Sequence, residues 1–229
     1  MSAPIRIISS MATKQVLAEL IALFHQQSPH RVDLESVGGV DAAKRVQAGE
    51  PFDVVILAAN AIDKLIADGK IVPGSRVDLA KSGVSIAVRH GAPHPDVSTE
   101  EAVKQAVAAA PTVSYSTGPS GVHLAKLFER WGIAEEIRPR TVQAPPGVPV
   151  GSLVASGDVT LGFQQLSELV NLEGIDVLGP LPDAIQIITT LSAGLAATST
   201  QAEAVRELLA FMVSPVSVDA KQRNGVEPA

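Results

Sequence analysis

Two short segments rich in serine, threonine and glycine follow predicted strands and precede predicted helices, and their residue types suit the binding of a small ligand. In the first, Ser9–Thr13 follows the strand-like run Ile5–Ile8. In the second, Ser116–Gly121 follows the strand-like run Thr112–Tyr115. Backbone N–H groups in the first turn of a helix are unpaired and lie at the positive end of its dipole, so such turns bind anions. We therefore expect two half-sites, far apart in sequence, that face one cleft and bind one negatively charged ligand.

The second segment shows the pattern most clearly. Ser120 is the predicted N-cap of a helix whose buried stripe includes Leu124 and Leu127. Thr117 and Gly121 flank it in the same turn. The simpler interpretation is an ordinary strand–helix connection that binds only water, because serine and glycine are common in such loops. The repetition of the pattern in Ser9–Thr13 is what favours ligand binding.

His123 is the side chain best placed to transfer a proton, because it lies in the first turn of the same predicted helix. A helix N-terminus disfavours the imidazolium form, which would leave this histidine neutral and able to accept a proton. A histidine at this position can equally point into solvent or pack under the loop. Lys14 could anchor a carboxylate or simply be solvated. Asp41 and Glu168 could act as acids or bases, and both also fit the first turn of a helix.

The composition is that of an aliphatic α/β protein. Of the 229 residues 46% are hydrophobic and only 3% aromatic, and the net charge is −6, which argues against a nucleic-acid or anionic-membrane partner. Cysteine is absent and the five histidines lack the spacing of a zinc site, so no metal and no cofactor is expected. Nucleotide-binding glycine motifs are absent, and no apolar run approaches the roughly 18 residues of a membrane span, so no membrane insertion is expected.

The order of predicted elements indicates an α/β fold with two lobes. Strands and helices alternate up to residue 72, which is typical of a doubly wound sheet, and a second set begins at about residue 82. The apolar runs Val84–Val88 and Ile185–Thr190 are expected to be two strand crossovers between the lobes. We therefore expect each lobe to be a doubly wound sheet, with lobe I formed by residues 1–81 plus 184–229 and lobe II by residues 82–183.

Six segments occur in a distinctive order and spacing along nearly the whole chain: Ser9-Ser10, Gly38-Gly39, Ala43–Val55, Gly118–Gly121, Gly157–Phe163 and Ala210–Pro215. Together they resemble the type 2 periplasmic-binding fold, and most closely the molybdate-binding branch of the ABC-transporter solute receptors. The resemblance implies two lobes that close on a ligand held at the carboxyl ends of strands.

The resemblance also implies where a ligand would be held. Molybdate receptors of this branch use two serine hydroxyls, a tyrosine hydroxyl and backbone amides. By resemblance, the two serine positions fall at Ala12 or Ser10 and at Gly39-Val40, and the tyrosine position falls at Gln165. The backbone-amide positions fall at Ser120 and near Gly147-Val148. Most of the expected hydroxyls are therefore absent, which weakens binding of a tetrahedral oxyanion. Gln164 and Gln165 offer both donors and acceptors, which suits a carboxylate. The candidate ligand-binding residues are Ser9, Ser10, Met11, Ala12, Lys14, Gly39, Val40, Thr117, Ser120, Gly121, Val148, Gln164 and Gln165.

A neighbouring branch that the chain resembles is the aconitate isomerases, which use this receptor fold to shift a proton and a double bond in a tricarboxylate. This resemblance implies a small anionic organic acid as ligand and a base that moves its proton, for which His123 is the best-placed candidate in the sequence. The alternatives are a receptor for molybdate or another oxyanion, whose partner would be an ABC permease if the protein is exported, and a detached ligand-sensing domain. Met1–Pro4 contains no signal peptide. A cytoplasmic location is therefore expected, or a periplasmic one if the chain has been trimmed.

Overall fold

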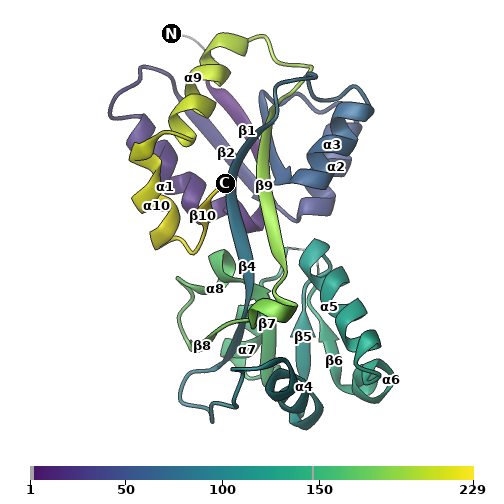
Figure 1. Ribbon diagram of the computed structural model, residues 1–229. Coiled ribbons are helices and arrows are strands. Elements are labelled where there is room, and N and C mark those ends of the chain that lie inside the picture. Colours follow the sequence, from purple (N-terminus) through teal and green to yellow (C-terminus); the bar gives the residue numbers. More distant parts are fainter. Residues whose placement is uncertain (1–2, 146) are drawn as a thin grey trace. The chain divides into compact units, whose positions relative to one another are not determined.

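The computed structural model describes residues 3–145 and 147–229, which form two compact units. Unit 1 comprises Met1–Ser82 and Thr190–Ala229, and unit 2 comprises Gly83–Thr189. The chain passes between the units twice, once within β4 (Val77–Arg89) and once within β9 (Ile188–Leu195) (Figure 1).

The second boundary differs from the one expected from the sequence. Residues 184–189 were expected in lobe I, but they belong to unit 2. The reason is packing, since Ile185 is buried in the core of unit 2 beside Leu181. The expected crossover Ile185–Thr190 is likewise wrong in its bounds: a 3-10 turn occupies Asp183–Ile185, and strand β9 begins only at Ile188.

Unit 1 is built on a mixed sheet whose central strands are parallel. Strand β1 (Ile5–Ser10) lies between β2 (Val32–Val37) and β3 (Val54–Ala58) and is parallel to both. Strand β9 pairs antiparallel with β3, and the short β10 (Glu227–Pro228) pairs antiparallel with the unit 1 part of β4. The carboxyl ends of β1, β2 and β3 therefore share one edge of the sheet, and each strand leads from that edge into a helix.

Helices cover both faces of this sheet, as Figure 1 shows: α1, α9 and α10 lie on one face, and α2 and α3 on the other. Each face has its own apolar core, and these two cores explain why β3 is apolar throughout. The helices of unit 1 are α1 (Lys14–Phe24), α2 (Gly39–Gln47), α3 (Ala59–Ala67), α9 (Ala202–Met212) and α10 (Val218–Arg223), with 3-10 turns at Met11–Thr13 and Pro215–Ser217.

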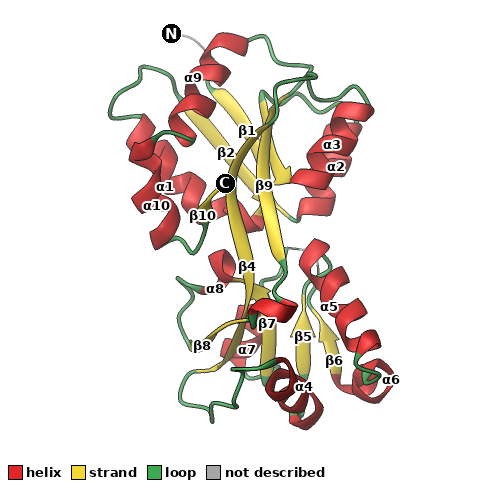
Figure 2. Cartoon of the chain, viewed as in Figure 1, coloured by secondary structure: helices red, strands yellow, loops and turns green. Residues whose placement is uncertain are grey.

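Unit 2 repeats this plan with shorter strands. Strand β5 (Val113–Tyr115) lies between β6 (Thr141–Gln143) and β7 (Leu161–Gln165) and is parallel to both. The unit 2 part of β4 pairs antiparallel with β7 and with β8 (Ile175–Pro180). The helices, drawn in red in Figure 2, are α4 (Glu100–Ala109), α5 (Pro119–Arg130), α6 (Ala134–Ile137), α7 (Val150–Ser156) and α8 (Leu166–Leu169), with 3-10 turns at Arg138–Arg140 and Asp183–Ile185.

The start of α5 in unit 2 differs from the sequence-based expectation. Gly118, not Ser120, is the N-cap of α5, because Pro119 takes the first helical position, for which its fixed φ is suited. Each unit nevertheless has the expected doubly wound α/β architecture, which is confirmed. None of the described helices combines the length and the apolar character that crossing a bilayer requires.

Candidate functional site

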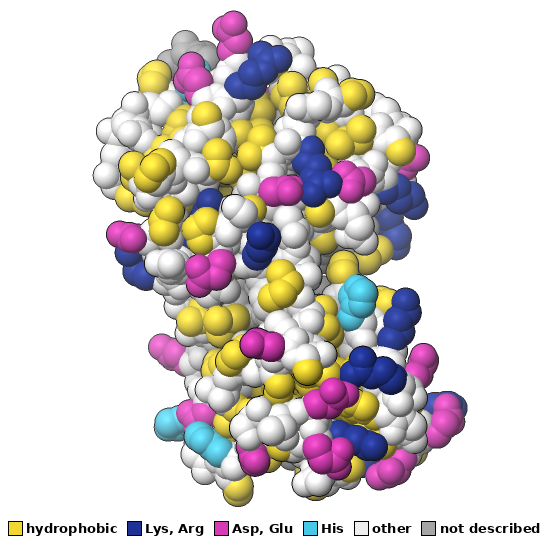
Figure 3. All heavy atoms as spheres, viewed as in Figure 1, with side chains coloured by type: hydrophobic (Ala, Val, Ile, Leu, Met, Phe, Trp, Pro, Cys, Tyr) yellow, Lys and Arg dark blue, Asp and Glu magenta, His cyan; other side chains and the backbone are white. Residues whose placement is uncertain are grey.

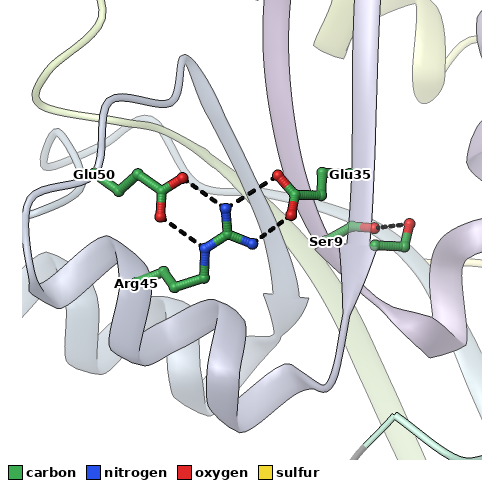
Figure 4. A network of polar contacts seen from close by, with 5 residues as sticks. Ser9, Glu35, Arg45 and Glu50 are labelled. Atoms are coloured by element: carbon green, nitrogen blue, oxygen red, sulfur yellow. Dashed lines mark hydrogen bonds and ion pairs between the residues drawn. The ribbon is translucent and has the colours of Figure 1, made fainter.

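The half-site of unit 1 lies where β1 ends. Ser9 is fully buried, and its Oγ lies 2.8 Å from Oγ of Ser36 on β2 (Figure 4). The next residue, Ser10, also has a buried hydroxyl, but its Oγ has no hydrogen-bond partner in the structure. The Ser10 carbonyl accepts a hydrogen bond from Thr13 Oγ1 at 3.0 Å, which fixes the turn that follows. Of the two serines predicted here, Ser9 is therefore satisfied within the sheet and Ser10 is the one available to a ligand.

Ser10 lies against the start of α2. A Cβ atom added to Gly39 would stand 3.5 Å from Cβ of Ser10, an ordinary van der Waals contact. Gly39 is the first residue of α2 and follows the N-cap Gly38, so its turn has the unpaired N–H groups of a helix start. The side chain of Val40 in the same turn is exposed. A buried hydroxyl and a helix N-terminus thus occupy the same edge of the unit 1 sheet.

The remaining unit 1 candidates lie in the turn after β1. Met11 and Ala12 belong to the 3-10 turn Met11–Thr13, and Ala12 is buried in the apolar core. Its side chain cannot donate a hydrogen bond to a ligand, so only its backbone can contribute. Lys14 is the first residue of α1 and is exposed. The structure thus places all six of these candidates, Ser9 to Ala12, Gly39 and Val40, at one edge of unit 1, with Lys14 just beyond.

A network of charged side chains holds the opposite end of α2. The Arg45 guanidinium donates to Glu35 on β2 and to Glu50 after α2, as Figure 4 shows. It also lies over the ring of Phe52, at 5.4 Å from the centroid, and Arg6 lies over the same ring at 5.1 Å. These contacts fix α2 on the sheet, and so position Gly39 beside Ser10. A small pocket of roughly 160 Å³ lies at this end of unit 1, lined in part by Phe52 and Lys70, away from the residues proposed to bind ligand.

The half-site of unit 2 begins with the loop between β5 and α5. Gly121 is required there, because a Cβ atom at residue 121 would overlap the backbone carbonyl oxygen of Ser116. The loop therefore turns back onto the first turn of α5, and Ser120 in that turn is 3% exposed. Phe128 packs α5 against the sheet through ring contacts to Tyr115 of β5 and to Phe163 of β7.

His123 is exposed on α5, one turn after the loop. Of the two simpler alternatives to a catalytic role, pointing into solvent or packing under the loop, the structure shows the first, so the ring is accessible from solvent. Thr117, another candidate, is exposed and lies immediately before the N-cap Gly118. The loop thus presents small polar residues and a helix start, with an accessible imidazole nearby.

Two glutamines form the end of β7, and they differ in their partners. Gln164 is buried, and its Oε1 accepts a hydrogen bond from the backbone N–H of Gly151 in α7 at 3.2 Å. Gln165 is also buried, but its Oε1 has no hydrogen-bond partner. Alternation along the strand sends the two side chains to opposite faces of the sheet. Gln165 thus shares with Ser10 the property that marks a site, a buried polar atom left without a partner.

The strand register brings Gln165 to the level of the β5–α5 loop. Strands β5 and β7 are parallel neighbours, with Tyr115 opposite Phe163. Continuing this register by two residues places Gln165 level with Thr117. The end of β7 and the loop before α5 therefore belong to the same edge of the unit 2 sheet.

Val148 behaves differently from what the resemblance implies. Its backbone N–H donates to the carbonyl oxygen of Pro145 at 3.0 Å, so this amide is already used within its own loop. Its side chain is 38% exposed. Val148 lies two residues before α7, whose Gly151 N–H is bonded to Gln164, so the loop still adjoins the same edge of the sheet.

Sequence reasoning missed three of these relationships: the Ser9–Ser36 pair, the steric need for Gly121, and the bond from Gly151 to Gln164. The first had a usable signal, because serines at matching positions near the ends of neighbouring strands can pair. The other two depend on tertiary geometry. In the described part of the chain, no group of three or more His, Cys, Asp or Glu side chains is arranged to hold a metal ion.

The charged side chains on the face drawn in Figure 3 do not form a basic field. On the face drawn in Figure 3, blue and magenta side chains are interspersed. The net charge is −6. Recognition of an anion would therefore depend on local N–H and side-chain donors and not on long-range attraction.

Comparison with known proteins gives a family and a relative. A family model described as bacterial extracellular solute-binding protein matches residues 5–227. An aconitate isomerase from a Pseudomonas species is 36% identical over 228 residues, covering 97% of this chain and 87% of the relative.

Solved structures similar to this one include binding proteins for molybdate and for sulfate. The periplasmic molybdate-binding protein of Azotobacter vinelandii superposes with a TM-score of 0.82 at 19% identity, covering 98% of this chain and 99% of that chain. A sulfate-binding protein of Mycobacterium tuberculosis superposes with a TM-score of 0.80 at 15% identity, covering 100% and 88%. At these identities the likeness establishes the type 2 periplasmic-binding fold, as expected from the sequence, and not the ligand.

Proposed function

Because the chain belongs to the bacterial extracellular solute-binding protein family, we propose that it binds a small unsaturated polycarboxylate of the aconitate type and isomerises it. The observation that carries this proposal is the 36% identity to an aconitate isomerase along almost the entire chain. The alternative, a receptor for molybdate or another oxyanion, draws support from the structural neighbours, whose identities are below 20%.

The chemistry of the two half-sites favours the polycarboxylate. Ser10 supplies one hydroxyl in unit 1, whereas Ala12, Gly39 and Val40 have none. In unit 2, the resemblance to molybdate receptors implies that Gln165 takes the position of their tyrosine. An amide can donate through Nε2 or accept through Oε1, so it suits a ligand with several carboxylates better than a single tetrahedral oxyanion.

The proposed reaction is an allylic proton shift. A base removes a proton from the methylene carbon, the double bond migrates, and a proton is added to the former vinyl carbon. N–H donors at the start of α5 stabilise the negative charge that spreads onto the carboxylates. His123 is the proposed base, since its exposed ring on α5 is accessible to a ligand bound at the β5–α5 loop.

A thermal-shift panel with molybdate, sulfate, citrate, cis-aconitate and trans-aconitate tests the ligand class. A ligand present at 100 times its dissociation constant adds about 2.7 kcal/mol to the free energy of unfolding. We expect both aconitates to raise the melting temperature, with molybdate and sulfate giving no shift. A shift with molybdate and none with the organic acids would favour the oxyanion receptor instead.

A further inference from the structure

The side chain of Gln165 lies on the face of the unit 2 sheet that helix α5 covers. Phe163, two residues earlier on β7, has its ring centroid 5.9 Å from that of Phe128 of α5. Alternation along a strand sends residues 163 and 165 to the same face. Gln165 also pairs with Val84 of β4, which is buried in the same apolar core as Phe128. Two neighbouring strands thus place this amide on the α5 side of the sheet.

Along the strand direction, Gln165 reaches the level at which α5 begins. The register of β5 and β7, continued by two residues, places it level with Thr117, and α5 starts at Pro119. A Cβ atom at Gly121 would lie 3.2 Å from the Tyr115 ring, so the first turn of α5 packs on the end of β5. No side chain caps this 12-residue helix, and its first turn carries no acidic residue. The amide of Gln165 and the uncapped N–H groups of α5 therefore share one face and one edge of the sheet.

The oxygen of this amide lacks a hydrogen-bond donor. Gln165 is 6% exposed, and its Oε1 has no partner among the described residues. An amide oxygen only accepts hydrogen bonds, and a buried acceptor left unpaired costs about 1–3 kcal/mol. A fully ionised carboxylate offers acceptors alone, whereas a protonated carboxyl group has one O–H and a carbonyl oxygen. The combination of an unpaired acceptor with N–H donors therefore complements a protonated carboxyl group.

Ionisable side chains around this edge do not supply the missing donor. His123 is exposed on α5, and burial raises the pKa of Tyr115, which keeps its phenol neutral. Burial also raises the pKa of Glu168 on α8 to about 7, but this carboxyl group is bonded to Gln164, which faces the other side of β7. Strand β7 has no ionisable side chain, and the unit 2 part of β4 has only Arg89, at its far end. The remaining charged residues of α5 lie in its second half: Lys126, Glu129 and Arg130.

We propose that the unit 2 half-site binds one carboxyl group of the ligand in its protonated form, with the O–H donating to Gln165 Oε1 and the carbonyl oxygen accepting from N–H groups in the first turn of α5. This rests on the function proposed above and names the ionic form of the acid that the site selects. Gln165 is then a residue that determines specificity. A fully ionised polycarboxylate, molybdate or sulfate would leave its Oε1 buried and unpaired.

A protonated carboxyl group also eases the proposed proton shift. Removal of the methylene proton spreads an electron pair onto the conjugated carboxyl group. An ionised group would gain a second negative charge, whereas a protonated group gains only one, which the N–H donors of α5 stabilise. The proton on the carboxyl oxygen is not consumed. The base still removes one proton from carbon, and one proton still returns to carbon.

Titration calorimetry with trans-aconitate at pH 8, in phosphate and in Tris, measures proton uptake because the two buffers differ in ionisation enthalpy. We expect uptake of nearly one proton per bound ligand, and a dissociation constant that rises about tenfold per pH unit above the last pKa of the free acid. Gln165→Leu and Gln165→Met both remove the acceptor. They should lose the uptake and bind at least about tenfold more weakly, and either suffices if the other does not fold. The control Gln105→Leu removes an exposed amide of α4 and should match the wild type.

Two further variants identify the group that takes up the proton, since an arriving anion favours protonation of nearby side chains. Uptake that is unchanged in His123→Gln and Glu168→Gln and lost on substitution of Gln165 supports the proposal. Uptake that disappears in either of those two variants, or persists without Gln165, overturns it. Binding of trans-aconitate without uptake also overturns it, because the amide then presents Nε2 to an ionised carboxylate, and this leaves the polycarboxylate function standing. Absence of binding between pH 5.5 and 8 overturns the proposed function, and this proposal with it.

Discussion

The backbone carbonyl oxygen of Ser116 occupies the space that the Cβ atom of residue 121 would need, so only glycine fits at Gly121. This contact folds the β5–α5 loop onto the helix that it precedes. Among the glycines of unit 2, an added Cβ atom would come closest to a neighbouring atom at Gly121. The loop geometry, and with it the N–H groups that we propose to hold a carboxylate, depends on this missing side chain.

Replacing Gly121 by alanine should therefore displace the loop. We expect the free energy of unfolding to fall by about 1–3 kcal/mol, the usual effect of overpacking, and aconitate binding to be lost. Gly118→Ala is the control, because a Cβ atom there would lie 3.6 Å from Ser116 Oγ, in ordinary contact. Urea denaturation of both variants measures the difference, and equal stability of the two would show that the contact is easily relieved.

Alanine substitutions at Ser10 and Ser9 should have different effects, the first on ligand binding and the second on stability. Ser10 Oγ makes no hydrogen bond within the protein, so Ser10→Ala should leave the unfolding midpoint nearly unchanged while weakening aconitate binding by about 1.5–3 kcal/mol, the contribution of a hydrogen bond to a charged group. Ser9→Ala leaves Ser36 without its partner and should lower stability by about 1 kcal/mol. Calorimetry and urea denaturation of both variants check the contrast, which fails if Ser10→Ala binds as tightly as the wild type.

The two glutamines of β7 allow the same comparison in unit 2. Gln165→Leu removes a buried oxygen that has no partner, so stability should be kept or slightly raised while aconitate affinity falls at least about tenfold. Gln164→Leu breaks the bond to Gly151 N–H and should destabilise the protein by about 1–3 kcal/mol. Wild-type affinity in folded Gln165→Leu would remove this residue from the site.

The raised pKa of Glu168 predicts a pH dependence of stability that needs no ligand. The group is protonated in both states below pH 4.5, whereas between pH 4.5 and 7 only the unfolded chain ionises it. Its stabilising contribution is therefore complete at low pH and is lost as pH rises through 7. Relative to the wild type, Glu168→Gln should gain up to about 3 kcal/mol over this range, one pKa unit being about 1.4 kcal/mol.

Denaturant unfolding at pH 4, 5.5 and 7.5 measures this difference, with Glu173→Gln as an exposed control. A gain for Glu168→Gln that is the same at all three pH values would show that Glu168 is not held in its neutral form.

The architecture was predictable because central strands such as β3 are buried on both faces and the longer helices have an apolar stripe. Val54–Ala58, for instance, reads as a central strand from its unbroken aliphatic run. The boundary at residue 183 was wrong, since an apolar residue such as Ile185 does not reveal which of two cores it will enter. Helix starts were less certain for a related reason: Ser120 and Gly118 are both acceptable caps, and Pro119 decides between them.

The candidate site was predictable only in outline. Sequence placed Ser9 and Ser10 together at the end of a strand, but only the register with β2 shows that Ser9 is bonded to Ser36 and Ser10 is not. In the same way, Gln164 and Gln165 are adjacent and chemically identical. Their different roles come from the alternation of side chains and from the position of α7.

The central claim, that this chain moves an allylic proton of a bound polycarboxylate, is tested most directly by incubating it with trans-aconitate in D₂O and recording proton NMR spectra. We predict that cis-aconitate appears and that its carbon-bound protons are partly replaced by deuterium, because the transferred proton exchanges with solvent. If the protein binds trans-aconitate and its spectrum stays unchanged at stoichiometric protein concentration, the claim is contradicted.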